Sequence, residues 1–216
     1  MTEIQPSLFP IRISEGLPEG FEYCEQAISS EHESRVLAQL ADLSFKEFQF
    51  RGFEGKRRVV SFGWRYDFND HKVLPADPIP PFLLEVYRTV QATSRFVLRD
   101  LQQVLVSEYA PGAPIGWHKD RPVFGDVMGL SLASSCSFRL RKLLDNGNWK
   151  RATVLLQPRS AYFLRGPVRW EWEHSIPAVK TLRYSITFRN LRHRSEPGVV
   201  HATLKALMRE RPIKEK

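Results

Sequence analysis

The spacing of apolar residues predicts two helices in the first half of the chain. Apolar positions recur at helical intervals between 36 and 43, behind a Ser30-Glu31-His32-Glu33 segment that has the S-x-x-E spacing of a capping box. A helix of about three turns is therefore expected after Ser30. A second helix should open at the proline-rich breaker 77–81, bury a stripe of apolar residues between 82 and 90, and end near Asp100.

Outside these helices the pattern changes to short apolar or alternating runs, which are typical of strands. Two β segments, around 45–53 and 59–66, are expected with a Gly-Lys-Arg-Arg connection between them. An Asn-Gly dipeptide within 145–148 predicts a tight hairpin turn. Helices followed by many short strands indicate an α+β fold whose strands form a double-sheet jelly roll. The later strands are predicted at 104–109, 127–133, 136–140, 152–156, 161–164 and 182–190.

Length and composition limit the domain organisation. A chain of 216 residues, 42% of them hydrophobic, supports one sizeable core. We expect an extended N-terminal arm over 1–20, a single domain over 21–194 and a basic tail over 195–216 with a possible helix at 201–210. No apolar run is long enough to span a membrane and no signal-peptide pattern is present, so we expect a cytoplasmic monomer without membrane contact. Cys24 and Cys136 are expected to be reduced, structural thiols.

The positive charge of the chain is concentrated toward its C-terminal end. The formal net charge is +8, and residues 180–216 contain ten Lys or Arg and three Asp or Glu, so this segment contributes 10 − 3 = +7. A basic patch near an active site fits a polyanionic substrate, because neutralising phosphates dominates non-specific affinity for nucleic acids. A solvated basic tail explains the composition equally well.

The candidate chemistry begins with His118 and Asp120. In an extended segment, side chains two residues apart project to the same face and can converge on one ion. His174 is the best third ligand, because a later strand can return beside the first. Two histidines and one carboxylate leave open positions for a cosubstrate and dioxygen, which is the pattern of non-haem Fe(II) oxygenases. A solvated His-Asp loop and a zinc hydrolase are the competing interpretations.

A strand at 181–189 adds two arginines to this picture. Its alternation puts Leu182 and Tyr184 on an apolar face and Arg183 and Arg189 on the opposite, polar face. The planar guanidinium binds a carboxylate through two hydrogen bonds, as holding a dicarboxylic keto acid beside a metal would require. The alternative is an exposed charged face.

From about Phe21 to Arg194 the chain resembles the AlkB family of Fe(II)- and 2-oxoglutarate-dependent dioxygenases. The resemblance implies a double-stranded β-helix core at about 101–190 with N-terminal helices, and a β nucleotide-recognition lid at about 44–70. It rests on Tyr109-Ala110-Pro111-Gly112, His118-Lys119-Asp120, His174-Ser175-Ile176 and the pair Arg183 and Arg189, in this order.

The resemblance also implies roles for the site residues. His118, Asp120 and His174 would hold Fe(II), with 2-oxoglutarate and O2 in the remaining positions. Decarboxylation of the keto acid to succinate and CO2 would accompany hydroxylation of an N-alkyl carbon, and formaldehyde would then be released.

The cosubstrate itself would be held by residues of the strands. Arg183 would pair with its distal carboxylate, helped by the hydroxyl of Tyr109, while Arg189 would lie on the cosubstrate side and brace Asp120. Ser107 stands where the family often has an asparagine, so a hydroxyl there would replace an amide contact or the contact would be lost.

The substrate is expected to be alkylated single-stranded DNA or RNA carrying N1-methyladenine or N3-methylcytosine, with Trp64, Arg65 and Tyr66 in the lid as base-binding candidates. At least one of the two aromatic residues is expected to be a core residue instead. DNA-repair members carry an acidic residue two positions after the metal-binding aspartate, whereas Pro122 follows Arg121 here. This departure supports the alternative of an oxygenase acting on tRNA or protein. A basic nucleic-acid-binding module with a vestigial metal site is the other alternative.

Overall fold

The computed structural model describes residues 16–50 and 53–192. Within these ranges the chain forms two longer helices, one short helix and a series of mostly antiparallel strands. The helices are α1 (Ser30–Ala41), α2 (Pro81–Ser94) and α3 (Gly166–Glu171), and the strands are β1 (Phe21–Cys24), β2 (Lys46–Phe50), β3 (Phe53–Phe62), β4 (Trp64–Asp67), β5 (Lys72–Pro75), β6 (Gln103–Tyr109), β7 (Ile115–His118), β8 (Phe124–Leu132), β9 (Cys136–Leu143), β10 (Trp149–Leu156), β11 (Ala161–Leu164), β12 (Glu173–Ile176) and β13 (Arg183–Leu191).

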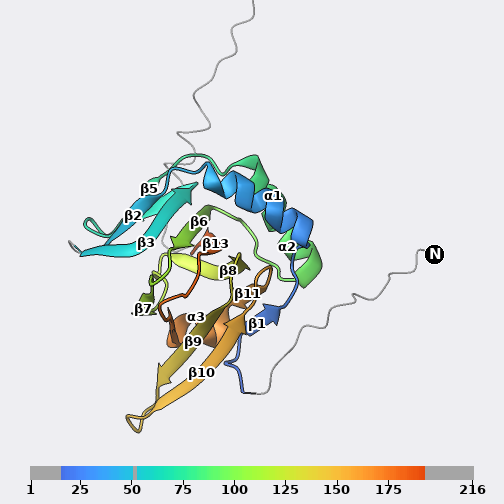
Figure 1. Ribbon diagram of the computed structural model, residues 1–216. Coiled ribbons are helices and arrows are strands. Elements are labelled where there is room, and N and C mark those ends of the chain that lie inside the picture. The colour runs from blue at the N-terminus through green and yellow to red at the C-terminus, as the bar shows by residue number, and fades with distance from the viewer. Residues whose placement is uncertain (1–15, 51–52, 193–216) are drawn as a thin grey trace, which may run out of the picture.

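Two sheets carry the fold. The larger has the order β1-β11-β8-β13-β6-β3-β2 and the smaller the order β10-β9-β12-β7. One apolar cluster, which includes Phe138 and Tyr162, joins the facing sides of the two sheets. A second cluster lies between the larger sheet and α1 and α2, which cover its other side (Figure 1). The predicted α+β jelly roll, a double-stranded β-helix with N-terminal helices, is confirmed.

Strand β13 lies in the middle of the larger sheet, between β6 and β8. Its side chains alternate as predicted: Ile186 and Phe188 pack toward the helices, whereas Arg183 and Arg189 lie on the opposite face of the strand. Both arginines are buried, so the alternative of an exposed charged face is wrong. The strand begins at Arg183, and Leu182 is an exposed residue before it.

The ends of the two helices differ from the predicted ones. The N-cap of α1 is Ser29, whose Oγ accepts a hydrogen bond from the backbone N–H of His32, and Ser30 is the first helical residue. The carboxylate of Glu33 does not complete a capping box, because it accepts a hydrogen bond from Ala133 N–H and pairs with Arg159. Helix α2 ends at Ser94 rather than near Asp100, because the next residue, Arg95, has a left-handed backbone (φ 61°).

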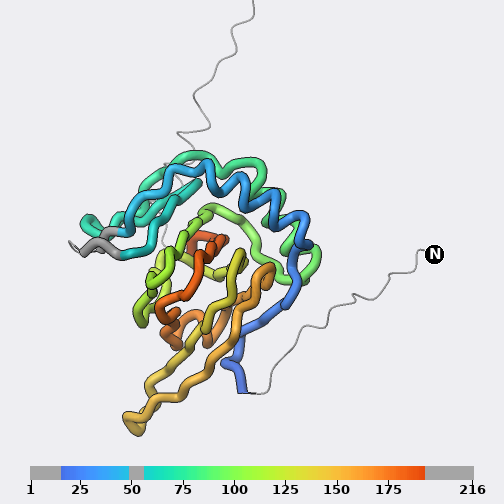
Figure 2. Tube along the Cα trace, in the orientation of Figure 1, coloured from blue at the N-terminus to red at the C-terminus, as the bar shows by residue number. Residues whose placement is uncertain are grey.

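The region expected as a lid consists of β2, β3, β4 and β5. Residues 55–58, predicted as a connection, belong to β3, because β3 pairs along its length with β2 on one side and with β6 on the other. The predicted segment at 59–66 is divided at Gly63, where the chain leaves the larger sheet and enters the small β4–β5 sheet. Figure 2 shows this region at one end of the molecule, beside the remaining strands of the two sheets.

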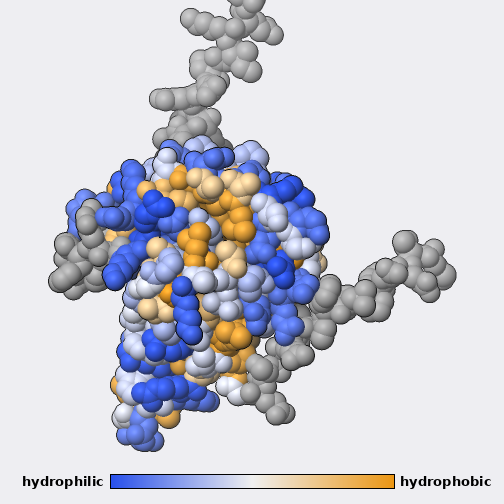
Figure 3. Space-filling view, viewed as in Figure 1, coloured by the Kyte–Doolittle hydropathy of each residue, from blue (hydrophilic) through white to orange (hydrophobic). Residues whose placement is uncertain are grey.

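Several smaller expectations can also be compared with the structure. The hairpin turn at 145–148 is confirmed between β9 and β10, a hairpin that projects from the body and is largely hydrophilic on the visible face (Figures 1 and 3). Cys24 and Cys136 are buried and form no disulfide. Among the described residues, no helix is long and apolar enough to cross a membrane. Most of the expected arm, the tail and its possible helix lie outside the described residues.

Candidate active site

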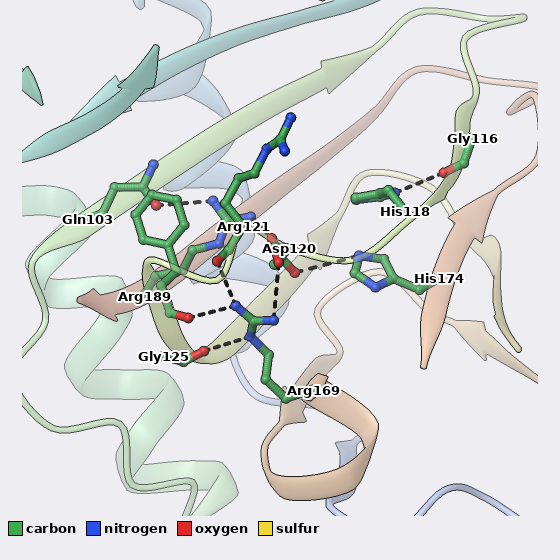
Figure 4. A network of polar contacts seen from close by, with 10 residues as sticks. Gln103, Gly116, His118, Asp120, Arg121, Gly125, Arg169, His174 and Arg189 are labelled. Carbon is green, nitrogen blue, oxygen red and sulfur yellow. Dashed lines mark hydrogen bonds and ion pairs between the residues drawn. The ribbon is translucent and has the colours of Figure 1, made fainter. Parts of the chain in front are cut away.

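The three residues proposed as metal ligands meet between the ends of β7 and β12. His118 and His174 are directly opposite each other in the β7–β12 ladder, and their ring centroids are 4.2 Å apart. Asp120 follows β7 by two residues, and its Oδ2 lies 3.7 Å from Nε2 of His174 (Figure 4). A strand pair, rather than a single loop, therefore brings the sequence-distant histidines together.

The side chains are not arranged as a preformed metal site. Nδ1 of His118 lies 2.8 Å from the carbonyl oxygen of Gly116, which leaves Nε2 as the available nitrogen (Figure 4). No three His, Cys, Asp or Glu side chains within the described ranges form a ready cluster of ligands. The backbone register already puts both histidines on the same face, so the difference lies in side-chain orientation.

Asp120 is held in its ionised form by neighbouring positive charge. Nη2 of Arg189 lies 2.5 Å from Asp120 Oδ1, and Nη1 of the same guanidinium donates to Gln103 Oε1 at 3.1 Å. Burial alone would raise the pKa of the carboxyl, but the positive charges of Arg189 and Arg169 hold it well below its usual range. Arg189 therefore braces Asp120, in the position that the sequence interpretation expected.

Both histidines are held in their neutral form. Burial lowers the pKa of His174 to about 3, and the nearby His118 acts in the same direction. Burial also lowers the pKa of His118, with the positive charges of Arg57 and Arg189 as smaller contributions. Neutral imidazoles beside an ionised carboxylate are the forms that bind a metal ion.

Arg169 fixes the chain that follows Asp120, and sequence reasoning missed it. This buried residue of α3 donates to the carbonyl oxygens of Gly125 and Phe124, both at 2.7 Å, and of Arg121 at 3.0 Å (Figure 4). A further hydrogen bond of 3.3 Å reaches the carbonyl oxygen of Asp120. Nothing in the sequence around 169 signals this role, since all four acceptors are more than forty positions away.

Arg183 provides the test of whether the site fits a dicarboxylate. Its side chain is 0% exposed, and its Nε donates to Ser131 Oγ at 3.2 Å. Both terminal nitrogens, Nη1 and Nη2, are buried without a hydrogen-bond partner. The guanidinium lies 5.0 Å from the ring of Tyr109, its partner in the β6–β13 ladder. Two unsatisfied parallel donors in a buried site match a carboxylate.

The inner end of the site is a small cavity of about 40 Å³. Its wall includes His118, Asp120 and His174 together with Tyr109 and Ser107, which is buried opposite Ser185 in the β6–β13 ladder. The structure thus brings the proposed metal ligands and the expected cosubstrate residues of β6 to one place.

A cleft of about 1290 Å³ leads from this cavity to the surface, beneath the lid strands. Arg65 and Tyr66 line the cleft, but Trp64 does not. Sequence reasoning missed Phe48 and Phe68, which form edge-to-face ring pairs with each other and, from Phe68, with Tyr66. The guanidinium of Arg121 lies 5.1 Å from the Tyr66 ring and 4.9 Å from the Phe68 ring. An aromatic cluster with arginines can stack on a base.

Comparison with known proteins decides the family. The model of the 2OG-Fe(II) oxygenase superfamily matches residues 20–189. The chain belongs to that superfamily. The protein is therefore a dioxygenase, and its family uses Fe(II), 2-oxoglutarate and O2. The donor set of His118, Asp120 and His174 and the two unpartnered terminal nitrogens of Arg183 fit these cofactors.

The relatives of this oxygenase include AlkB homologues. It is 29% identical over 176 residues to the mouse tRNA (carboxymethyluridine(34)-5-O)-methyltransferase ALKBH8, covering 77% of this chain and 25% of that protein. The Arabidopsis thaliana alkylated DNA repair protein ALKBH8 homolog is 28% identical over 150 residues, with 58% and 43% covered. The chain thus spans less than half the length of these two relatives.

Two further comparisons extend over most of the oxygenase. The uncharacterized protein L905 of Acanthamoeba polyphaga mimivirus is 24% identical over 186 residues, covering 80% of this chain and 85% of that protein. The solved structure of OsALKBH1 superimposes with a TM-score of 0.62 at 15% identity, covering 84% of this chain and all of that one. The expected AlkB-like family and its fold are confirmed.

Proposed function

We propose that this oxygenase removes alkyl groups oxidatively from bases in single-stranded DNA or RNA. The observation that carries the proposal is the pair of buried, unpartnered terminal nitrogens of Arg183, whose guanidinium lies 5.0 Å from the ring of Tyr109. Tyr109 lines the same small cavity as His118, Asp120 and His174. N1-methyladenine and N3-methylcytosine are the substrates named by the family resemblance.

The site residues would have separate roles in the reaction. His118, Asp120 and His174 would hold Fe(II), which supplies activation of O2 when it is bound. Arg183 would bind the distal carboxylate of 2-oxoglutarate and so fix its orientation, and Arg189 would keep Asp120 ionised and aligned. The lid and the inner cavity would exclude water and present the N-alkyl carbon to the site.

The balance of the reaction is simple. One oxygen atom of O2 enters succinate as 2-oxoglutarate loses CO2, and the other is inserted into a C–H bond of the N-alkyl group. The resulting hemiaminal breaks its C–N bond, which leaves N–H on the base and releases formaldehyde.

The first experiment tests the site by itself. Anaerobic protein loaded with Fe(II) is titrated with 2-oxoglutarate while the weak visible charge-transfer band is recorded. Arg183→Ala should weaken 2-oxoglutarate binding by about 30-fold or more, because it removes one partner of a buried charge pair. His174→Ala should abolish the band. The matched control is Arg151→Ala at an exposed position of β10, which should leave the titration unchanged.

The second step tests the substrate. Formaldehyde and succinate are measured with single-stranded oligonucleotides that carry N1-methyladenine or N3-methylcytosine. The proposal fails if the band forms normally but no methylated or otherwise modified base in DNA or RNA is turned over.

A second candidate, modification of a tRNA base, has its own support. The mouse relative is named for a tRNA modification, although the chain covers only 25% of that protein. Arg121 lines the cleft, and Pro122 after it stands where DNA-repair members carry an acidic residue. Assays with unmodified and modified tRNA therefore accompany the oligonucleotide assays.

A further inference from the structure

Arg57 of β3 is a buried cation without a counter-ion among the described residues. Its side chain belongs to a residue that is 7% exposed, and its Nε is buried without a hydrogen-bond partner. It is held instead by aromatic rings, with its Cζ 4.3 Å from the centroid of Phe48 and 5.9 Å from that of Tyr109. The adjacent Arg58 pairs with Glu108 at 2.6 Å. An unpaired buried charge is costly, so this guanidinium favours a ligand that offers acceptors.

The position of Arg57 joins the two parts of the site. The residue lines both the large cleft and the small inner cavity that contains His118, Asp120 and His174. In the β3–β6 ladder it is directly opposite Tyr109. A base that enters beneath the lid, with its alkyl group toward the proposed metal ligands, must therefore pass beside this guanidinium.

The charges around Arg57 do not cancel its own. Asp120 is already paired with Arg189, and the other acidic residues that line the cleft, Asp42, Glu47 and Asp77, are exposed. Arg121 adds a second cation over the aromatic cluster. The part of the cleft next to the inner cavity is therefore positive toward an incoming base.

Alkylated bases differ in charge and in the edge that they present. N1-methyladenine and N3-methylcytosine are cations at neutral pH and carry an exocyclic amino group, which donates hydrogen bonds. N1-methylguanine and N3-methyluracil have nearly the same shapes, but they are neutral and carry a carbonyl oxygen at the same place. A guanidinium only donates hydrogen bonds, so it repels the first pair and can bind the second.

We propose that Arg57 is a specificity-determining residue that selects neutral bases with a carbonyl edge, such as N3-methyluracil and N1-methylguanine, over cationic alkylated bases. The inference rests on the proposed function and deepens it. It reverses the order of substrates that the family resemblance implies, because that order belongs to sites with an acidic residue where this chain has Pro122.

The test compares single-stranded oligonucleotides that are identical except for one base, N3-methyluracil against N3-methylcytosine and N1-methylguanine against N1-methyladenine. The ratio of kcat/KM values within each pair is measured by formaldehyde release and by mass spectrometry of the product. The wild-type protein should favour the neutral base of each pair by about tenfold or more, as expected for one hydrogen bond to a charged group. This ratio can be measured without any variant.

Two variants and one control attribute the preference to the residue. Arg57→Gln should reduce the ratio toward unity through a loss on the neutral base, and Arg57→Glu should favour the cationic base. Lys56→Gln removes the same charge from an exposed neighbouring position of β3 and should leave both ratios unchanged. The anaerobic 2-oxoglutarate band should be unchanged in Arg57→Gln, which separates a substrate role from a cosubstrate role.

The possible failures are distinct. Demethylation of both members of a pair at equal rates, or an equal effect of Arg57→Gln on both, overturns the role of Arg57 and leaves the proposed function standing. Absence of turnover with all four bases overturns the role of Arg57, and the proposed function fails with it only if no other modified base in DNA or RNA is turned over. A weakened 2-oxoglutarate band in Arg57→Gln assigns the guanidinium to the cosubstrate and also overturns the inference.

Discussion

At the scale of single residues, Arg169 controls the geometry of the site without facing its ligands. Its guanidinium binds four consecutive or nearly consecutive backbone carbonyl groups between Asp120 and Gly125. The carbonyl groups of Asp120 and Arg121 belong to the connection between β7 and β8, and those of Phe124 and Gly125 to the start of β8. The position of the Asp120 carboxylate therefore depends on a side chain from a different part of the chain.

Arg169→Ala should lower the free energy of unfolding by at least about 2 kcal/mol, because several buried carbonyl groups would lose charged donors. Urea denaturation gives the change. The control is Arg165→Ala at the start of the same helix, where a surface ion pair with Glu22 should contribute less than about 1 kcal/mol. Equal midpoints for the two variants would show that Arg169 does not hold this connection.

The sequence predicted some site residues and missed others for a definite reason. Even spacing relates His118 to Asp120 on one segment and Arg183 to Arg189 on another. The structure brings His118, Asp120 and Arg189 together with His174. Arg57 has no such local signal, because its role depends on being opposite Tyr109 in another strand. The basic run that contains it predicts a connection between strands instead.

At the scale of elements, Gly63 is the point at which the lid departs from the larger sheet. It has a positive φ of 74°, and a Cβ at this position would lie 2.1 Å from the carbonyl oxygen of Gln102. Its backbone also exchanges hydrogen bonds with Asp77 and Ala76, which close the β4–β5 sheet against the end of β3. Only glycine satisfies both the dihedral angle and the close approach.

Gly63→Ala should destabilise the protein by more than the roughly 1 kcal/mol expected for a positive φ alone. Gly147→Ala isolates that smaller contribution, since Gly147 has φ 79° in the hairpin turn and open space around its Cα. Thermal unfolding of the two variants should therefore show the larger decrease in Tm for Gly63→Ala. A similar decrease in both would mean that the chain near Gln102 moves freely.

The kinds of elements were predictable, but their ends were not. Periodicity identified α1, α2 and most strands of the two sheets, because apolar residues must face one of two cores. The end of α2 depends on the left-handed backbone of Arg95, which the apolar period does not reveal. The division of the lid at Gly63 depends on its close approach to the distant backbone of Gln102. The short strand β1 and helix α3 were missed, since each is too brief to show a period.

At the scale of the whole molecule, the site lies between the two sheets, while the helices stabilise the larger sheet from outside. The carboxylate of Glu33 in α1 contacts Ala133, in the connection after β8, and Arg159, in the connection between β10 and β11. Ligand binding between the sheets should therefore add to the stability of the complete fold and not of one element alone.

Thermal unfolding should detect this stabilisation of the complete fold by ligands. Mn(II), used in place of Fe(II) to prevent oxidation, should raise Tm, and 2-oxoglutarate should raise it further. A ligand at 100 times its Kd adds about 2.7 kcal/mol, and each kcal/mol corresponds to about 2–4 °C for a chain of this size. In Arg183→Ala, the metal should still raise Tm, but 2-oxoglutarate should no longer raise it further. Retention of both increases in Tm would exclude Arg183 from cosubstrate binding.

The pairing of His118 with His174 across β7 and β12 also has a consequence for variation in chain length. A ladder of backbone hydrogen bonds sets the distance between the two imidazoles. This distance therefore does not depend on the number of residues between His118 and His174. The tip of the β9–β10 hairpin, at Asp145 to Asn148, can therefore gain residues while the histidines keep their places. Insertions at this tip, in evolution or by design, should therefore leave the spacing of the two histidines unchanged.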